Sequence, residues 1–334
     1  MTPQRLEEIL DRARTRRLLV IGDLMLDEFV WGKVGRISPE APVPVVEVTG
    51  ESFYPGGAAN VARNLREFTG DVSVLGAVGE DPSGQRLRGL LAEQKIELLG
   101  SAATPGFSTI VKTRIIARHQ QVVRVDRERV SGLSAKEVAK IAGAVRDKLP
   151  DVDAVIFEDY GKGFIGAELV SQIARDAKAA GKIVTADPNA RNPIDWTGMT
   201  AVKPNRSEAF LAAGLTSADS DLSPDKDSDL ARAGETLLKK WGAQYVLITL
   251  GENGMMLFQV GQTPHHIPTK ARQVFDVSGA GDTAIALFTL ALASDASPIE
   301  AAEIANHASA VVVGKLGTAT VTRAELMASF RDDL

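Results

Sequence analysis

Short runs of β-branched and apolar residues alternate with longer amphipathic stretches along most of the chain, and this alternation constrains the fold more than any other feature. It is the pattern of βαβ units built around a mainly parallel sheet. The candidate strands cover residues 17–21, 72–77, 153–157, 182–186, 200–202 and 245–249. The sequence therefore predicts a protein of the α/β class.

Polar residues follow five of these candidate strands directly, at 22–23, 158–163, 187–189, 203–205 and 250–254. Open α/β sheets bind their ligands beyond the carboxyl ends of the strands. We therefore expect the five polar segments to meet at one crevice, where the functional side chains would lie.

Two segments, residues 30–51 and 108–128, break the alternation of strand and helix. Apolar and polar residues alternate within the second segment, as they do in strands with one buried face. Both are expected to form a small separate sheet, and two interpretations of it stay open: a lid over the crevice, or a simple edge hairpin. Apart from this insertion, we expect residues 1–334 to form a single domain.

Composition excludes several classes of function. The net charge is -5 and the Lys and Arg residues are spread along the chain, so nucleic acid is not an expected partner. The chain has no Cys, which excludes disulfides and thiolate chemistry. The apolar runs are too short or too interrupted for a signal peptide or a membrane anchor. We therefore expect a soluble, cytoplasmic protein.

The segment FDVSGAGDT at residues 275–283, which leads into the apolar stretch 284–293, has the sharpest chemical meaning. Small residues at 278–281 let backbone N–H groups approach an anion, and a following helix adds its positive N-terminal end. Asp282 would then lie beside a bound phosphate, where a carboxylate can accept a proton from an attacking hydroxyl. A plain turn with a helix cap is the alternative interpretation.

A second cluster is PGGAANVARN at residues 55–64. Asn60 and Asn64 are four residues apart and share one face of the expected helix. Their amides suit the hydroxyl groups of a sugar, whereas the alternative is a turn with Asn on a solvated face. Other nucleotide motifs are absent from the sequence, including the P-loop, the protein-kinase loop and the dinucleotide fingerprint.

Four motifs occur in a fixed order: Gly22-Asp23, Gly56-Gly57-Ala58-Ala59-Asn60, Lys203-Pro204-Asn205-x-x-Glu208 and Asp276-x-x-Gly279-Ala280-Gly281-Asp282. In this combination the chain resembles the ribokinase-like, or PfkB, carbohydrate kinases over residues 17–327. The resemblance implies a three-layer α/β/α domain with a small β lid, ATP as the phosphoryl donor, and Mg²⁺. It also raises a monovalent cation as a further cofactor.

The resemblance also implies roles for individual residues. Asp282 would be the catalytic base, and the backbone of Gly279, Ala280 and Gly281 would form the anion hole. The residues expected at the nucleotide are Asn205, Glu208, Thr249, Gly251, Gly254 and Asn306, of which Asn205 and Glu208 would hold Mg²⁺ indirectly through the phosphates. The residues expected to bind the sugar hydroxyls are Asp23, Asp27, Gly56, Gly57 and Asn60.

Longer motifs resemble one group within the family, the kinases of D-glycero-D-manno-heptose 7-phosphate. They lie at residues 22–27, 36–45, 55–62, 159–163 and 313–318. The resemblance implies phosphorylation of the anomeric hydroxyl to the 1,7-bisphosphate, on the way to ADP-heptose for lipopolysaccharide. Some members of the group are fused to a nucleotidyltransferase. Because this chain ends at Leu334, we expect a separate protein to carry out that later step.

One departure bears on the acceptor: Asn189 follows Asp187-Pro188, where that group is expected to carry Lys. A phosphorylated acceptor needs cations at its far end, and the second lid segment and its neighbourhood supply them. Lys112, Arg124 and Lys162 are the predicted phosphate ligands, with Arg114 and Arg118 also available. Cations on an edge strand also prevent aggregation, so this simpler interpretation stays open for each.

Two rival functions follow from the same motifs. The first is a kinase of another sugar or sugar phosphate, with the same chemistry and a different acceptor. The second is a silent family member that binds nucleotide or sugar as a regulator. Lid strands in this family often pair between subunits, which makes a homodimer an expectation as well.

Overall fold

The computed structural model describes residues 1–100, 107–118, 120–216, 222–271 and 274–331. Within them the central sheet has nine strands, which in spatial order are β13 (His265–Ile267), β12 (Met255–Gln259), β11 (Tyr245–Thr249), β10 (Ala201–Val202), β9 (Ile183–Asp187), β8 (Ala154–Glu158), β1 (Arg17–Gly22), β4 (Asp71–Leu75) and β5 (Glu97–Leu98). Adjacent strands from β11 to β5 are parallel. Strand β12 is antiparallel to both of its neighbours, β11 and β13. The predicted α/β class is confirmed.

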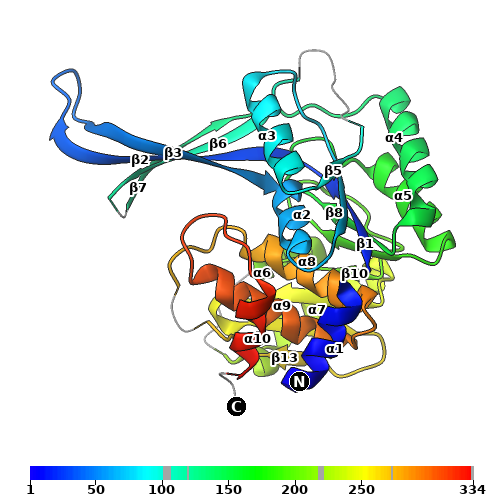
Figure 1. Cartoon of the computed structure of the whole chain (residues 1–334). Helices are drawn as coiled ribbons and strands as arrows, with labels where there is room; N and C mark the ends of the chain where they lie inside the picture. The colour runs from blue at the N-terminus through cyan, green and yellow to red at the C-terminus, as the bar shows by residue number, and fades with distance from the viewer. Residues whose placement is uncertain (101–106, 119, 217–221, 272–273, 332–334) are drawn as a thin grey trace.

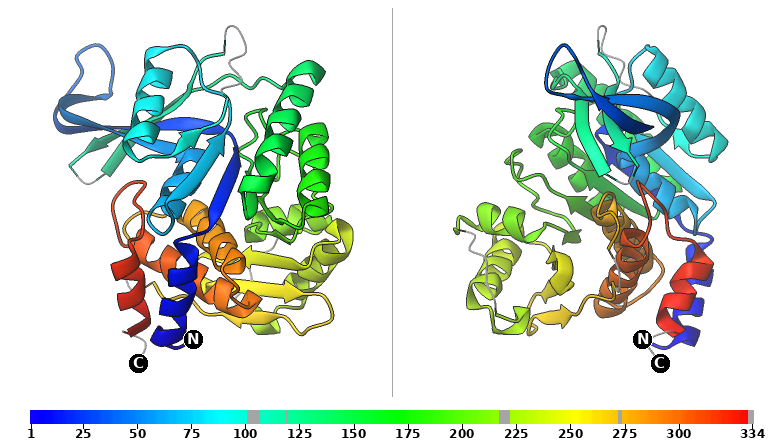
Figure 2. Two further views of the ribbon diagram at one scale, coloured as in Figure 1. Left: turned by 45° about the vertical axis from the view of Figure 1, so that its right-hand side comes forward. Right: turned by 90° about the vertical axis from the view of Figure 1, so that its left-hand side faces the viewer.

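Helices cover both faces of this sheet (Figures 1 and 2). One face packs against α1 (Pro3–Ala13), α2 (Ala58–Arg66), α3 (Pro82–Glu93), α8 (Ala280–Ala293), α9 (Pro298–Val313) and α10 (Arg323–Arg331). The other face packs against α4 (Ala135–Lys148), α5 (Ala167–Ala179), α6 (Arg206–Ala213) and α7 (Ser228–Trp241). Successive side chains of a strand point to opposite faces, so Leu18 and Val20 of β1 enter one core and Leu19 and Ile21 the other. These are the three layers expected of the family.

A second sheet of four strands projects from this body as an arm (Figure 1). Its spatial order is β3 (Pro44–Gly57), β2 (Leu24–Ile37), β6 (Ile110–Ala117) and β7 (Gln120–Arg127). Two antiparallel hairpins, β2–β3 and β6–β7, join through the parallel pair β2–β6. The register pairs Asp27 with both Tyr54 and Lys112, which places these three side chains on one face of the arm.

Each of the six predicted strands overlaps an observed one, but the arm is longer than the sequence indicated. Its strands begin at Leu24 and end at Gly57, beyond the predicted bounds 30–51, because residues 24–27 are buried and show no polar alternation. Residue 119, inside the predicted segment 108–128, lies outside the described residues. The antiparallel pair β12–β13 was not predicted, since β12 is an apolar run without period-two alternation.

The parallel register brings the predicted polar segments together. Gly22 pairs with Glu158, and Glu158 pairs with Asp187. Lys203 N–H bonds to the carbonyl oxygen of Ala186, and Asn205 bridges to Thr249. The carboxyl ends of β1, β8, β9, β10 and β11 therefore form one edge, as the sequence predicts.

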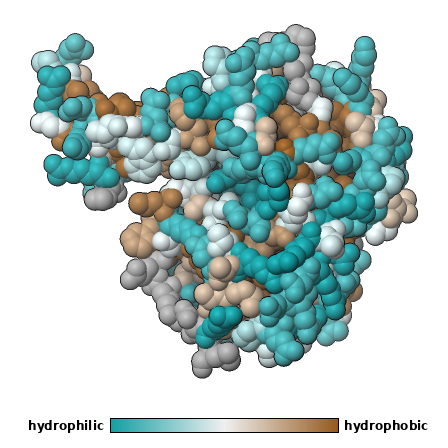
Figure 3. Space-filling model, in the orientation of Figure 1, coloured by the Kyte–Doolittle hydropathy of each residue, from teal (hydrophilic) through white to brown (hydrophobic). Residues whose placement is uncertain are grey.

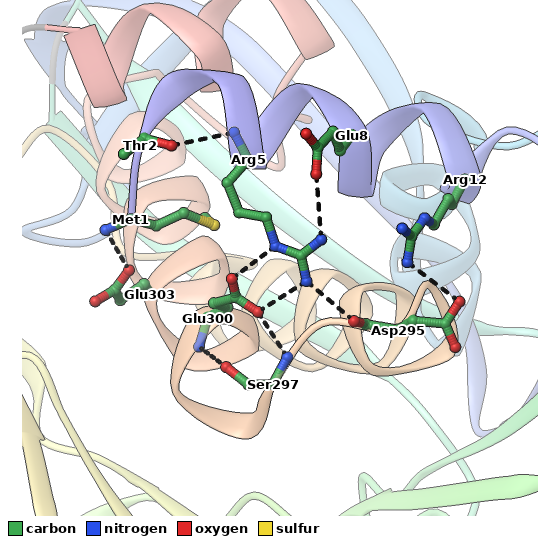
Figure 4. A network of polar contacts seen from close by, with 9 residues as sticks. All are labelled: Met1, Thr2, Arg5, Glu8, Arg12, Asp295, Ser297, Glu300 and Glu303. Carbon is green, nitrogen blue, oxygen red and sulfur yellow. Dashed lines mark hydrogen bonds and ion pairs between the residues drawn. The ribbon is translucent and has the colours of Figure 1, made fainter.

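Helix α1 is fastened to the turn between α8 and α9 by an ion pair (Figure 4). Arg5 donates from Nε to Glu300 Oε1 at 2.8 Å and from Nη2 to Glu300 Oε2 at 3.2 Å. The Glu300 carboxylate also accepts the Ser297 N–H in a capping box. The hydrogen bonds from Arg5, followed by those from Ser297, lower the pKa of Glu300 to about 2.

We predict that Glu300→Gln destabilises the protein by about 1 kcal/mol at neutral pH, a value discounted for the exposure of the pair. Because the folded pKa is below the ordinary value of 4.5, the carboxylate stabilises the fold above that pH and loses its effect as the pH falls toward 2. Chemical denaturation at several pH values measures this difference. Glu8→Gln, which removes a 3.4 Å exposed contact of the same arginine, is the control and should change little. An equal loss in both variants at pH 7 would contradict the assignment.

Among the described residues, no helix is both long enough and apolar enough to span a membrane.

Candidate active site

Asp282 lies in the first turn of α8, at the edge where the polar segments meet. The helix begins at Ala280 after Gly279, which has a φ of 81°. Asp282 is 5% exposed, and its two carboxylate oxygens accept different hydrogen bonds. Asn60 Nδ2 donates to Oδ2 at 2.7 Å, and Tyr160 Oη donates to Oδ1 at 2.6 Å. The carboxylate is thus fixed in position, with lone pairs left for a substrate proton.

Asn60 is oriented by its own helix. Its side-chain oxygen accepts a hydrogen bond from Arg63 Nη1 at 3.3 Å, which leaves the amide nitrogen facing Asp282. Asn64, one turn further on, accepts the Thr283 hydroxyl and donates to the Asn60 carbonyl oxygen. Both Asn side chains are fully buried, so the alternative of a solvated face is wrong. They join α2 to the catalytic turn of α8.

The surroundings of Asp282 shift its pKa and that of Tyr160. Burial raises the pKa of Asp282 above its ordinary value, against the opposing effect of the hydrogen bonds from Tyr160 and Asn60. Burial and the nearby Asp282 charge raise the pKa of Tyr160 well above its ordinary value, so the phenol remains a donor. A carboxyl group with a raised pKa is a stronger proton acceptor than a solvated one.

We predict that Tyr160→Phe lowers kcat by about tenfold, in line with the 1.5–3 kcal/mol typical of a hydrogen bond to a charged group. Loss of this donor also raises the pKa of Asp282, so the acid limb of the kcat profile should move to higher pH. Steady-state rates across pH 5–9 measure both effects. A profile that coincides with that of the wild type would remove Tyr160 from the site.

The turn before α8 has the geometry of an anion cradle. Asp276 Oδ1 accepts the Ser278 N–H and its Oδ2 accepts the Gly317 N–H, which fixes the turn against the loop after α9. A Cβ atom on Gly279 would lie 2.8 Å from Asn60 Nδ2, so glycine is required both for the positive φ and for the close approach. At the start of α8 the Ala280 N–H donates to the Val277 carbonyl oxygen at 3.3 Å, which closes the turn. The N-terminal end of a helix favours a bound anion.

A cleft of about 780 Å³ opens beside this turn, a size that suits a nucleotide. It is lined by Thr249, Gly251, Gly254, Ala280, Gly281 and Asn306, among others. Asn306 donates to the Pro268 carbonyl oxygen at 2.7 Å and so holds the segment after β13 against α9. Four of the six predicted nucleotide residues, Thr249, Gly251, Gly254 and Asn306, therefore line one cavity.

Asn205 and Glu208 form a capping box at the start of α6. Asn205 Oδ1 accepts the Glu208 N–H at 2.9 Å, and Glu208 Oε2 accepts the Asn205 N–H at 2.8 Å. Both residues also line a second cleft of about 530 Å³, together with Tyr160, Lys162 and Asn189. The described residues contain no group of three His, Cys, Asp or Glu side chains placed to hold a metal ion. A divalent ion would have to be held chiefly by phosphates, as is common for Mg²⁺.

Asp23 has a different environment from the one predicted. Its carboxylate accepts the backbone N–H groups of Tyr160, Lys162 and Phe164 at 2.9, 3.0 and 3.2 Å. It is 2% exposed, and burial raises its pKa despite these three bonds. Direct contact with a sugar hydroxyl does not fit this geometry, because the carboxylate is already used to anchor the loop that carries Tyr160.

Asp27 belongs to β2 of the arm, and Arg114 of β6 donates to its Oδ1. A Cβ atom on Gly56 would lie 2.3 Å from Asp27 Oδ2, so this glycine leaves room for the carboxylate. Gly57, with a φ of 59°, turns the chain into α2. These residues therefore belong to the strands of the arm, and none of them lines the nucleotide-sized cleft.

The predicted lid cations differ in their surroundings. Lys112 lies over the ring of Tyr160, 4.8 Å from its centroid, and burial and neighbouring cations lower its pKa. Lys162 pairs with Glu128 at 2.7 Å. Arg124 pairs with Asp126 on its own strand, and about half of its side chain is exposed. Lys112 therefore faces the site most directly.

Comparison with known proteins decides the family. Residues 15–325 match the family described as pfkB family carbohydrate kinase. The chain belongs to this family. Membership makes it a phosphotransferase that acts on a sugar hydroxyl, and ribokinase-like kinases use ATP and a divalent metal.

The curated relatives of this kinase are longer proteins. "Bifunctional protein HldE" of Desulfatibacillum aliphaticivorans is 43% identical over 316 residues, which cover 95% of this chain and 63% of the relative. The protein of the same name from Helicobacter hepaticus is 41% identical and is covered to 64%, with 94% of this chain matched. The kinase thus spans less than two thirds of the length of either relative.

Solved structures establish the ribokinase-like fold. Phosphofructokinase-2 from Escherichia coli in complex with potassium superposes with a TM-score of 0.75 at 18% identity, covering 95% of this chain and 98% of that one. Arabidopsis thaliana ribokinase complexed with ribose and ATP gives 0.69 at 20% identity, covering 95% and 99%.

Sequence reasoning assigned no role to three side chains of the kinase site. Tyr160 bonds to Asp282, Arg63 orients Asn60, and Lys203 forms an ion pair with Asp187 at 2.8 Å. Tyr160 and Lys203 both stand in quoted motifs, immediately after strands. Their position at the carboxyl ends of β8 and β10 was the signal that could have identified them.

Proposed function

We propose that this kinase transfers the γ-phosphoryl group of ATP to the anomeric hydroxyl of D-glycero-D-manno-heptose 7-phosphate, with Asp282 as the general base. The observation that carries the proposal is the buried Asp282 carboxylate, fixed by Asn60 and Tyr160 between a nucleotide-sized cleft and a cationic arm. The choice of acceptor rests on the long motifs at residues 36–45 and 55–62, and on relatives that are named HldE.

The transfer follows from this arrangement. The acceptor hydroxyl gives its proton to Asp282, and its oxygen forms the new bond to the γ-phosphorus as the bond to the β-phosphate oxygen breaks. The N–H groups of Gly279, Ala280 and Gly281 would face the charge that develops on the transferred group. Mg²⁺ would supply charge neutralisation across the phosphates when it is bound. ADP leaves with the electron pair of the broken bond.

The donor nucleotide would occupy the larger cleft. Thr249, Gly251, Gly254 and Asn306 line it, and its inner end reaches Ala280 and Gly281. Asn205 and Glu208 stand at the neighbouring cleft, where they would hold Mg²⁺ through the phosphates. A monovalent cation is a further part of this proposal.

The acceptor would lie between Asp282 and the arm. Asp27, Asn60 and the backbone at Gly56 and Gly57 would bind its hydroxyls, while Asp23 would act indirectly by anchoring the loop of Tyr160. The cations near the arm are close enough to repel Lys112. Its pKa is lowered by each of three neighbours, Lys162, Arg114 and Arg124. Such a cluster suits the phosphate of the acceptor.

The arm also suits a role in assembly. We propose that it closes over the bound sugar as a lid, within a single domain of residues 1–334. Exposed apolar side chains at Ile37, Val43 and Val48, close to the β2–β3 turn, would pair with a second subunit. Figure 3 shows hydrophobic surface on the arm. The product would pass to a nucleotidyltransferase, and the use of ATP and a free sugar phosphate fits the cytoplasm.

The test is ADP release with Mg-ATP across a panel of sugars and sugar phosphates, including both anomers of the heptose 7-phosphate. Turnover confined to one anomer of the heptose phosphate would support the proposal. Preference for another acceptor, which the Asn189 departure makes the main rival, would discard the heptose substrate and keep the kinase. No turnover with any acceptor, despite ATP binding, would favour a regulatory protein.

A further inference from the structure

Lys203 occupies an unusual position beneath the anion cradle. It follows β10 directly, and only 3% of the residue is exposed. Its ammonium group pairs with Asp187 Oδ2 at 2.8 Å. Burial by itself would lower the pKa of Lys203, but Asp187 and Glu158 together raise it above the ordinary value for lysine. The side chain is therefore a buried cation at neutral pH.

The ammonium group lies against the first turn of α8. A Cβ atom placed on Gly281 would be 3.6 Å from Lys203 Nζ and 3.9 Å from Asp187 Oδ2. Any side chain at position 281 would therefore meet this ion pair. The ion pair therefore lies within van der Waals range of the backbone at Gly281, in the first turn of α8.

Carboxyl groups surround this cation. The charged and titratable groups that act on Lys203 or on Asp282 from the neighbouring elements are Asp27 of β2, Glu158 of β8, Tyr160 after β8, Asp187 of β9, Glu208 of α6 and Asp282 of α8. Lys203 opposes the raised pKa of Glu158, Asp187, Glu208 and Asp282.

Glu158 is a second acidic side chain buried beside this cation. It is 2% exposed, and its Oε2 atom has no hydrogen-bond partner. Burial, together with Asp187 and Asp282, raises the pKa of Glu158 well above its ordinary value, so its carboxyl group favours the neutral form. Lys203 lowers the pKa of Asp282, so the loss of Lys203 would remove a cation that helps to keep Asp282 ionised.

We propose that Lys203 is a positioning residue for phosphoryl transfer, whose fixed positive charge behind Gly281 holds Asp282 as a carboxylate and attracts the terminal phosphate into the cradle. The proposal rests on the role of Asp282 proposed above. Lys203 keeps its proton throughout: the acceptor proton goes to Asp282, the new P–O bond forms at the sugar oxygen, and ADP leaves. Its contribution is electrostatic and is made before the reaction begins.

The test compares Lys203→Met and Lys203→Gln, which remove the charge, with Lys203→Arg, which keeps it. We expect both neutral variants to lose about a hundredfold in kcat, and the acid limb of kcat to move up by about one pH unit. Calorimetry with a non-hydrolysable ATP analogue should show about tenfold weaker binding, whereas adenosine should bind as in the wild type. Lys203→Arg should keep the acid limb of the wild type.

The outcomes separate the possible roles. A structural role alone would lower the melting temperature of the neutral variants and leave their pH profile and analogue affinity unchanged, which would overturn the proposal. If Lys203→Met fails to fold, Lys203→Gln, which keeps an N–H donor toward Asp187, decides the same question. Near-normal turnover of Asp282→Asn would instead refute the proposed base. If Asp282→Asn is inactive but the acid limb of kcat in Lys203→Gln coincides with that of the wild type, only the role of Lys203 is refuted.

Discussion

Asp282→Asn is expected to fold, to bind nucleotide, and to lose at least about a hundredfold in kcat, because general-base catalysis typically contributes 10²–10⁴-fold. Asn60 and Tyr160 donate to different oxygens of Asp282, and an asparagine side chain has only one oxygen to accept such a bond. Asparagine also cannot take up the proton of the acceptor hydroxyl. KM for ATP should change little, since the carboxylate lies at the acceptor side of the cradle. Steady-state rates with the preferred acceptor measure the loss.

Stability separates this effect from misfolding. Burial raises the pKa of Asp282, so its ionised form costs stability at neutral pH and a neutral amide removes that cost. The melting temperature of Asp282→Asn should therefore equal or exceed that of the wild type, as is common when an active-site charge is removed. Asp295→Asn, the same change at the exposed far end of α8, is the matched control and should keep full activity. Turnover of Asp282→Asn within threefold of this control would exclude Asp282 as the base.

The central sheet could be predicted because its strands are buried on both faces. Such strands read as short apolar runs, and the polar residues that follow them mark where each run ends. The same reasoning failed at β12, where Met255–Gln259 is equally apolar but pairs antiparallel with β11. Strand direction is decided by the connection, here the short 3-10 turn Gly251–Asn253, which is too brief for a parallel crossover. The lengths of connections therefore carry information that periodicity does not.

The site was predicted only in part, since local sequence does not show which distant groups meet. Asp282 stands in a glycine-rich turn and could be identified from its neighbours alone. Its partner Tyr160 is 122 residues away, and only the packing of α8 on β8 brings the two together. Asp23 shows the same limit of local sequence. Its place after β1 suggests a ligand contact, whereas the three N–H groups that donate to its carboxylate belong to a loop more than 130 residues later.

The cations of the arm show how the structure ranks residues that sequence treats alike. Lys112 and Arg124 are both basic residues in alternating strands, and both lie on the same face, since Arg124 pairs with Arg114 in register. The charge of Arg124 is paired with Asp126, and about half of the Arg124 side chain is exposed. Lys112 instead lies over the ring of Tyr160 and is more buried. An ammonium group shielded from solvent attracts an anionic ligand more strongly than an exposed ion pair does, because solvent screens the exposed pair.

Lys112→Met is therefore expected to raise KM for a phosphorylated acceptor by about a hundredfold, in line with the 1.5–3 kcal/mol typical of a hydrogen bond to a charged group. Methionine keeps the aliphatic length that packs on Tyr160 and removes only the charge. KM for ATP should stay unchanged, because the nucleotide cleft is lined by residues from other elements.

Arg124→Met is the matched comparison and should raise the same KM by no more than about fivefold, as expected for a solvent-screened pair. The measurement is a set of saturation curves for the acceptor phosphate and for its dephosphorylated sugar. The difference between wild type and Lys112→Met should vanish with the dephosphorylated sugar, because no second phosphate is present to be bound. An equal rise in KM for both acceptors would show that Lys112 acts through Tyr160 and the hydroxyls, and the phosphate site would then have to be sought at Lys162.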